Sequence, residues 1–95
     1  MVNFAKMNEL AELFSALSDP SRLRIIAALT AGELHVGAIA EQVSLSESAT
    51  SHHLRHLRQM RIVQARKAGR QVFYSLLDTH VEQLYQVGLE HVIHG

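Results

Sequence analysis

The feature that most limits how this chain can fold is a change of hydrophobic period after residue 59. Before it, apolar residues recur at helical spacing, and four helices are expected, at residues 4–17, 20–31, 36–43 and 47–59. Residues 62–68 and 71–77 instead alternate, and Gly69-Arg70 separates them, which predicts a β-hairpin. A last helix should follow from Asp78 or Thr79. A short helix, a tight turn, a second helix and a hairpin predict a winged helix-turn-helix, a mainly α fold with one hairpin (α+β).

Local residues mark several of these helix ends. Asp19 is a candidate N-cap with Pro20 at the first helical position, and Ser46 is the favoured N-cap of the helix over 47–59. Ser44 with Glu47 is an alternative that would form a capping box. Within the second helix, four residues are expected to be buried: Leu23, Ile25, Ile26 and Leu29.

The length and composition limit the chain to one small domain, residues 1–95, with a modest core. Hydrophobic residues make up 47% of the 95 residues, and burial at a dimer interface would add to what one short chain can bury. There is no cysteine, which excludes a disulfide framework, a thiolate metal site and a cysteine nucleophile. No apolar run approaches membrane-spanning length and no signal peptide is visible, so we expect a cytoplasmic protein that does not associate with membranes.

The charge is unevenly distributed although the formal net charge is zero. Residues 48–77 contain no Asp or Glu, yet they hold six of the nine basic residues: Arg55, Arg58, Arg61, Arg66, Lys67 and Arg70. Such a block predicts a surface that binds a polyanion, most simply double-stranded DNA. The alternative is an ordinary solvated basic face.

The helix over 47–59 has a polar stripe suited to reading DNA. Ser48, Ser51, His52 and Arg55 follow one another at helical spacing, opposite a core face with Ala49, Leu54 and Leu57. At the hairpin, Arg66, Lys67 and Arg70 are the candidate contacts to phosphates or to the minor groove. The three histidines of this helix, His52, His53 and His56, do not complete a ligand set with their neighbours and are expected at the surface or its boundary.

Four possible metal ligands lie in the last helix: Asp78, His80, His91 and His94. His80 and His91 are eleven residues apart, so they share a helix face but lie about 16 Å apart along the axis. One helix cannot gather all four, whereas two antiparallel copies place residue 80 of one opposite residue 91 of the other. The pattern therefore predicts a homodimer with two equivalent metal sites shared between chains. Taken singly, Asp78 can be only a helix cap and the histidines only surface residues.

An apolar stripe runs beside these ligands. It consists of Val81, Leu84, Tyr85, Gly88 and Val92. We expect it to pack partly on the chain's own core and partly on a partner helix, which would leave the ligands at the rim of a dimer interface.

Three segments resemble the ArsR/SmtB family of metal-sensing transcriptional repressors: residues 18–24, residues 45–58 and residues 69–76. The resemblance extends over essentially the whole chain. It implies a dimer that binds operator DNA without metal and leaves it when metal binds. The C-terminal ligand pattern is similar to that of the zinc and cobalt sensors, and some nickel sensors share it. A second family site uses a cysteine-containing motif; here that cysteine position holds His35 and the acidic position Ala38, so that site is expected to be disabled.

Three imidazoles and one carboxylate suit tetrahedral Zn²⁺ or Co²⁺, whereas Ni²⁺ would want more ligands. A closed site with four protein ligands leaves no position for a reacting water, so neither an enzyme nor a small organic substrate is expected. The alternative is a repressor of the same fold that answers another ligand or none, with zinc structural or incidental. The sequence leaves open the physiological metal, the operator, the regulated genes and the residues that couple metal to DNA.

Overall fold

A computed structural model describes residues 3–95, which form five helices and a three-stranded antiparallel sheet. In chain order the elements are α1 (Phe4–Leu17), α2 (Pro20–Leu29), β1 (Leu34–His35), α3 (Val36–Val43), α4 (Glu47–Gln59), β2 (Val63–Ala68), β3 (Gln71–Leu76) and α5 (Thr79–His94). This is a winged helix-turn-helix, as predicted: α3 and α4 form the helix-turn-helix and the β2–β3 hairpin forms the wing. The predicted domain starts at Met1, and its first two residues lie outside the described residues.

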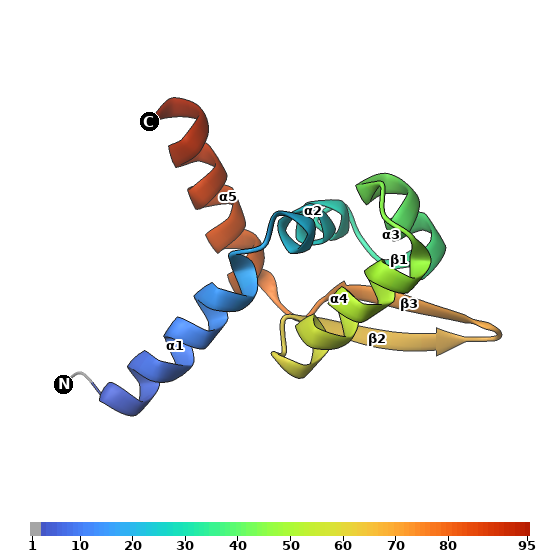
Figure 1. Cartoon of the computed structure of the whole chain (residues 1–95), viewed down its shortest axis with the longest axis horizontal. Coiled ribbons are helices and arrows are strands. Elements are labelled where there is room, and N and C mark those ends of the chain that lie inside the picture. Colours follow the sequence, from blue (N-terminus) through green and yellow to red (C-terminus); the bar gives the residue numbers. More distant parts are fainter. Residues whose placement is uncertain (1–2) are drawn as a thin grey trace.

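The elements divide into a body and two projecting helices. In Figure 1, α2, α3, α4 and the sheet form the body, and the wing extends from it on the right. The helices α1 and α5 project on the opposite side and diverge from each other, so each leaves much of its length outside the body. Over residues 3–95, none of the helices has the length and apolar character needed to cross a lipid bilayer.

Most helix ends follow the expected residues. The Asp19 side chain accepts a hydrogen bond from the Arg22 N–H (3.0 Å), and the Ser46 hydroxyl accepts one from the Ala49 N–H (3.0 Å), which confirms both as N-caps. The alternative, a capping box at Ser44, is not formed. Ser44 adopts a left-handed conformation (φ 59°) that ends α3, so Ser46 alone caps α4.

The sheet contains one strand that the sequence did not predict. The strand order is β1-β3-β2, and the two-residue strand β1 pairs antiparallel with β3, with Leu34 opposite Tyr74 and His35 opposite Phe73. In the predicted hairpin, Gly69 takes a positive φ of 62° in the two-residue loop, a conformation that glycine adopts without cost. Because β1 is so short, it has no alternating pattern of its own.

The core lies between the helices of the body and one face of the sheet. Its fully buried members include Ile25 and Ile26 of α2, Ile39 of α3, and Leu54 and Leu57 of α4. Burial of Leu23, expected from the helical pattern, is wrong: the side chain is 37% exposed and lines a groove beside α1 and α5.

Candidate functional site

Two of the predicted metal ligands meet at the start of α5. Asp78 is the N-cap, and its Oδ1 accepts a hydrogen bond from the His80 N–H (2.8 Å). The same oxygen lies 3.4 Å from His80 Nδ1. Both side chains face solvent, with exposed fractions of 48% for Asp78 and 82% for His80. The cap thus places a carboxylate beside an imidazole, in a position that is open to a ligand from outside the chain.

The other two predicted ligands lie at the far end of the same helix. His91 and His94 are one helical turn apart in the last turn of α5, and both are exposed. About 16 Å of helix axis separates them from the first pair. Within residues 3–95 of one chain, no three side chains of the types that bind metals come together. Within one chain the four residues therefore form two separate pairs, one at each end of α5.

Between α1, α2 and α5 lies an exposed apolar groove of about 460 Å³. Its lining includes Phe14 of α1, Leu23 of α2, and Leu84 and Val92 of α5. In the predicted stripe of α5, Val81 is buried and Tyr85 packs on the chain's own core, whereas Leu84 is 39% exposed and Val92 79% exposed. A Cβ added at Gly88 would meet no atom within 4 Å. The stripe thus packs on the chain's core only at its N-terminal part and leaves the rest uncovered.

These features fit a divalent metal held between two copies. The donor set has three imidazoles and one carboxylate, which is suited to tetrahedral Zn²⁺ or Co²⁺. Each pair is solvent-accessible, and the uncovered apolar face lies between the pairs on the same helix. An antiparallel second α5 would bring the His91 and His94 end of one copy to the Asp78 and His80 end of the other.

The candidate DNA-reading face belongs to α4. Leu54, Leu57 and Thr50 are fully buried, which turns the opposite side of the helix outwards. On that outer side Ser48, His52 and Arg55 are exposed and Ser51 is half-buried. Ala49, expected in the core, is only half-buried, and it accompanies Ser51 at the boundary. The four polar residues lie on consecutive turns, as the sequence pattern requires.

His53 has a structural contact that sequence reasoning missed. Its Nδ1 accepts a hydrogen bond from Arg22 Nε of α2 (3.2 Å), and Arg22 Nη1 also donates to the carbonyl of Ala16 in α1 (3.5 Å). Arg22 therefore links α1, α2 and α4. The two residues are 31 positions apart, so no local pattern could have revealed the pair.

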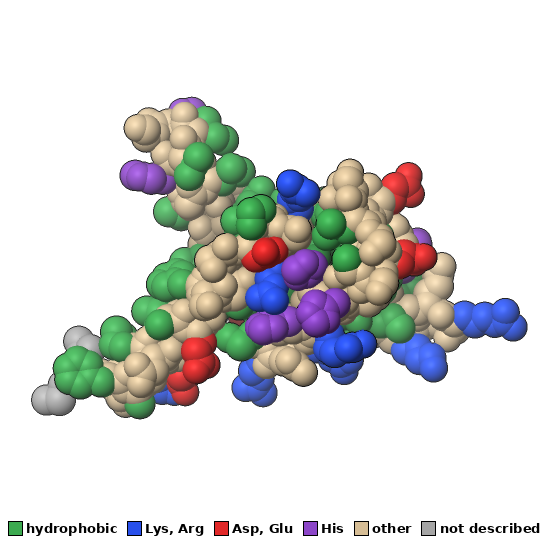
Figure 2. Space-filling view, in the orientation of Figure 1, with side chains coloured by type: hydrophobic (Ala, Val, Ile, Leu, Met, Phe, Trp, Pro, Cys, Tyr) green, Lys and Arg blue, Asp and Glu red, His purple; other side chains and the backbone are tan. Residues whose placement is uncertain are grey.

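A row of basic side chains follows one edge of the molecule. Figure 2 shows Lys and Arg side chains along the lower edge from α4 to the tip of the wing, with Asp and Glu side chains elsewhere in this view. Lys67 lies near the end of β2 and Arg70 in the wing loop, and both are exposed. Both cations would be available to phosphates of a nucleic acid that lay against α4.

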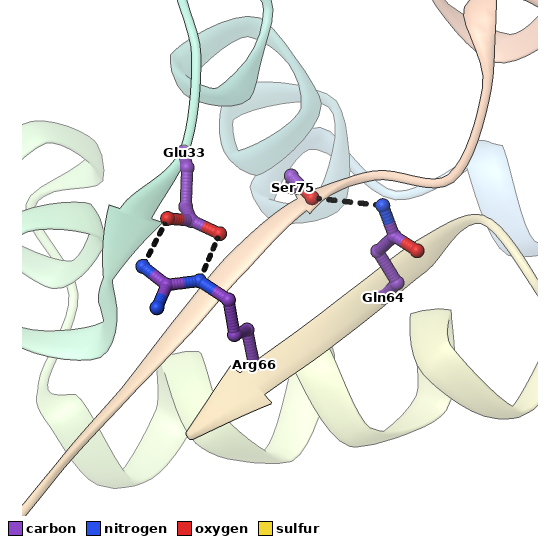
Figure 3. A network of polar contacts seen from close by, with 4 residues as sticks. All are labelled: Glu33, Gln64, Arg66 and Ser75. Carbon is purple, nitrogen blue, oxygen red and sulfur yellow. Dashed lines mark hydrogen bonds and ion pairs between the residues drawn. The ribbon is translucent and has the colours of Figure 1, made fainter. Parts of the chain in front are cut away.

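Arg66 differs from the other wing cations because it is already paired. Its Nε and Nη2 donate to the two carboxylate oxygens of Glu33, at 3.1 and 2.6 Å (Figure 3). Its guanidinium carbon also lies 5.0 Å from the centroid of the Phe73 ring, within the range of a cation–π contact. The pair lowers the pKa of the Glu33 carboxyl from its ordinary value of 4.5, mainly through these hydrogen bonds. Glu33 was not among the predicted functional residues.

His35 also has a role in the fold. Its Nδ1 accepts from the Ala38 N–H (3.4 Å) as the N-cap of α3, and its ring meets Phe73 edge-on, with centroids 5.9 Å apart. The side chain is half-buried and contacts both α3 and β3.

The chain is similar to known bacterial regulators. Residues 19–65 match the family model described as "Bacterial regulatory protein, arsR family". The chain is 47% identical over 92 residues to a transcriptional repressor SmtB homolog of Synechocystis sp., covering 97% of this chain and 70% of that protein. It is 43% identical to the HTH-type transcriptional regulator NmtR of Mycobacterium tuberculosis, covering 90% and 72%, and 41% identical to a cadmium resistance transcriptional regulatory protein, a CadC homolog of Staphylococcus aureus, covering 94% and 76%.

Solved structures agree with this similarity. The solution structure of apo-NmtR superposes with a TM-score of 0.83 at 39% identity, over all of this chain and 80% of that one. The homodimeric winged helix-turn-helix DNA-binding domain of Mb0332 from Mycobacterium bovis superposes with a TM-score of 0.84 at 29% identity, over 96% and 88% of the two chains.

Proposed function

This chain belongs to the arsR family of bacterial regulatory proteins, and from that premise we propose that it is a homodimer that leaves its operator DNA when a divalent metal ion binds between its subunits. Its similarity to relatives within the family identifies it as a metal-sensing transcriptional repressor of the SmtB type and not as an enzyme. The finer parts of the proposal are the identity of the metal, its ligands and the way in which binding releases DNA.

The proposed metal site takes Asp78 and His80 from one subunit and His91 and His94 from the other. The observation that carries it is the division of these residues into two exposed pairs at opposite ends of one helix, with an uncovered apolar face between them. An antiparallel pair of α5 helices would bury that face and bring the pairs together twice, once at each end. In this arrangement α1 and α5 are the dimerisation helices of a single domain, residues 1–95.

The donor chemistry favours Zn²⁺, with Co²⁺ as the close alternative. Four nitrogen and oxygen donors without a thiolate match the tetrahedral preference of both ions. Ni²⁺ would need further ligands, from water or from the N-terminal segment. When bound, the ion would supply only a fixed geometry, because four protein ligands would leave no open position for chemistry.

The proposed DNA interface consists of the outer face of α4 and the wing. Ser48, Ser51, His52 and Arg55 would face base edges and phosphates in a major groove. Lys67 and Arg70 would contact phosphates beside it or the neighbouring minor groove. In a symmetric dimer the two α4 helices would have to lie about 34 Å apart to enter successive major grooves.

Metal and DNA would oppose each other through this spacing. Ligand pairs joined across the interface hold the two α5 helices at one offset, and each body follows its own α5. If that offset places the α4 helices away from the DNA spacing, metal lowers the affinity for DNA, and DNA lowers the affinity for metal by the same factor. The coupling free energy between metal and DNA binding would be about 1–3 kcal/mol, the range common for allosteric proteins.

A titration tests the proposal. The metal-free dimer is bound to a fluorescent duplex carrying the DNA just upstream of its own coding sequence, and Zn²⁺ is then added while anisotropy is recorded. We expect release with the wild-type protein and none with His80→Ala or His91→Ala, whereas Gln86→Ala, an exposed position on the same helix, should behave as wild type. Release that persists in both histidine variants would contradict the proposed site.

The second candidate is a repressor in which zinc is structural. The donor set favours it, because a closed site with four protein ligands is also the form that structural zinc sites take. Sedimentation in the presence of a chelator separates the two: a sensor stays dimeric without metal, and a structural site does not. Dissociation to monomers on chelation would replace the sensor proposal with this one.

A further inference from the structure

The two faces of the wing sheet have different surroundings. Side chains alternate between the faces of a strand, and residues directly opposite each other on neighbouring strands share a face. Val63 and Leu76 are paired and belong to the face that packs on the core, against which α4 also lies. By this alternation Lys67 and its partner Val72 belong to the α4 side. Arg66 and its partner Phe73 belong to the outer side, which faces away from α4.

The contact of Arg66 with Glu33 spans the sheet. Because the strand order is β1-β3-β2, the Arg66 side chain on β2 must cross the central strand to reach Glu33, which directly precedes β1. Figure 3 shows the guanidinium lying across β3 with both carboxylate oxygens engaged. On its way the guanidinium passes over the Phe73 ring, at 5.0 Å from the ring centroid. Both edge strands are therefore tied together over the middle one.

The contacts of Arg66 and Phe73 continue into the helix-turn-helix. Phe73 is opposite Arg66 on one side and opposite His35 on the other, and the His35 ring contacts it edge-on. His35 in turn caps α3, the helix that packs against α4. A continuous set of contacts thus leads from the middle of the wing to the helix-turn-helix.

We propose that Glu33, Arg66 and Phe73 form a wing clamp that fixes the angle of the wing relative to α4, and that Arg66 is a positioning residue for DNA binding and makes no contact with DNA. The proposal rests on the proposed function in one respect, since it assumes that α4 and the wing bind DNA together. It divides the basic block by role: Lys67 and Arg70 contact the polyanion, whereas Glu33, from outside the block, neutralises Arg66.

The salt dependence of DNA binding tests this division. Each phosphate contact that is lost lowers the slope of log K against log salt by about 0.9, and a dimer loses two contacts per substitution. Lys67→Ala and Arg70→Ala should therefore reduce the slope. Arg66→Ala should leave the slope unchanged and weaken binding to the same upstream duplex by about two- to fivefold, the range expected for an exposed ion pair. Gln64→Ala, which removes the adjacent Gln64–Ser75 hydrogen bond on the same face, is the matched control and should alter neither quantity.

A charge exchange gives the sharper result. Glu33→Gln should weaken binding about as much as Arg66→Ala. The double substitution Glu33→Arg with Arg66→Glu should bring the affinity back toward wild type and leave the slope unchanged. If Arg66 contacts phosphate, Arg66→Ala lowers the slope and the exchange weakens binding further, because a carboxylate then faces the DNA. Either of these results would overturn the proposal, and so would an Arg66→Ala variant with unchanged affinity.

A measurement without DNA separates failure of the clamp from failure of the proposed function. Amide hydrogen exchange of β1 and β3 should be faster in Arg66→Ala and Glu33→Gln than in wild type or in Gln64→Ala. If the wild-type protein binds no DNA but exchange is faster in the two clamp variants, the proposed function is contradicted and the clamp is retained. Exchange that is unchanged in both clamp variants would overturn the clamp itself.

Discussion

At the scale of single residues, Asp78 combines two tasks that substitution can separate. Its Oδ1 caps α5 by accepting from the His80 N–H, and its carboxylate is a proposed metal ligand. Asp78→Asn keeps a good capping side chain but loses the anionic ligand, whereas Asp78→Ala loses both.

We therefore expect Asp78→Ala to lower the free energy of unfolding of the metal-free protein by about 1 kcal/mol, and Asp78→Asn to leave it nearly unchanged. Both variants should bind Co²⁺ more weakly. Urea unfolding in the presence of a chelator gives the first quantity and a Co²⁺ absorption titration the second. Unweakened Co²⁺ binding by Asp78→Asn would remove Asp78 from the ligand set.

Arg61 has a backbone conformation that its residue type disfavours. Its φ is 60°, and it follows α4 in a Schellman turn in which the Ile62 N–H donates to the Leu57 carbonyl (2.9 Å) and the Arg61 N–H to the Arg58 carbonyl (3.0 Å). A residue with a Cβ pays about 1–2 kcal/mol in this conformation, and glycine avoids most of that cost.

Arg61→Gly should accordingly be more stable than Arg61→Ala by about 1 kcal/mol. The alanine variant is the matched control, since it loses the same charge and keeps the Cβ. The comparison requires urea unfolding at one protein concentration, because a dimer's stability depends on concentration. Equal stability of the two variants would mean that the turn relaxes when the side chain changes.

At the scale of elements, the ion pair across the wing sheet predicts a pH dependence. Arg66 lowers the pKa of Glu33 below its ordinary value of 4.5, so the folded chain holds this proton less readily than the unfolded chain. A carboxyl group of this kind stabilises the fold above its unfolded pKa and loses that contribution as pH falls through the lowered folded pKa.

The coupling between Glu33 and Arg66 should therefore be present at neutral pH and disappear as pH falls below 4.5. A double-mutant cycle with Glu33→Gln and Arg66→Ala, read out by urea unfolding at several pH values, measures it. The same cycle on Gln64 and Ser75, which have no ionisable side chain, should not vary with pH. A coupling that persists in acid would mean that Phe73 packing, and not charge, holds Arg66.

The elements were predictable wherever a local pattern specified them. Helical spacing, the caps Asp19 and Ser46, and the glycine of the wing loop are each local, and the structure follows them. The division of the ligands was predictable for the same reason, since the rise of a helix fixes how far residue 80 lies from residue 91.

What the sequence did not predict depends on contacts between distant segments. The strand β1 exists because β3 lies beside it, and its two residues have no period of their own. Glu33 and Arg66 are 33 positions apart, so no local sequence pattern indicates the ion pair that distinguishes Arg66 from the other wing cations. Leu23 shows the limit of periodicity itself: an apolar residue at core spacing can instead line an exposed groove.

At the scale of the whole molecule, the two projecting helices carry an exposed apolar surface that a second copy would cover in the proposed dimer. Large apolar side chains are exposed along both projecting helices, among them Phe4 and Phe14 of α1 and Val87, Val92 and Ile93 of α5. Figure 2 shows hydrophobic side chains, in green, along α1 and α5, and fewer of them along the basic lower edge. An apolar surface on this scale in a small domain is the mark of an interface. In the proposed antiparallel arrangement, the four metal ligands would come together only across that interface.

Mixed dimers test this arrangement without a structure of the complex. Each proposed site needs His80 of one subunit and His91 of the other, so a dimer of two His80→Ala chains has both sites damaged, and so does a dimer of two His91→Ala chains. A dimer with one chain of each kind places both substitutions in a single site and leaves the other site intact.

The mixed dimer, purified through two different affinity tags after co-refolding, should therefore bind one tight Zn²⁺ or Co²⁺ per dimer and recover metal-dependent release of DNA. A doubly tagged dimer of two His80→Ala chains is the control and should bind no tight metal. If each site were formed within one chain, every site in the mixed dimer would still lack a histidine, and mixing would restore nothing. Recovery in the mixed dimer alone thus follows from ligands exchanged between subunits, because complementation requires that each chain supply what the other has lost.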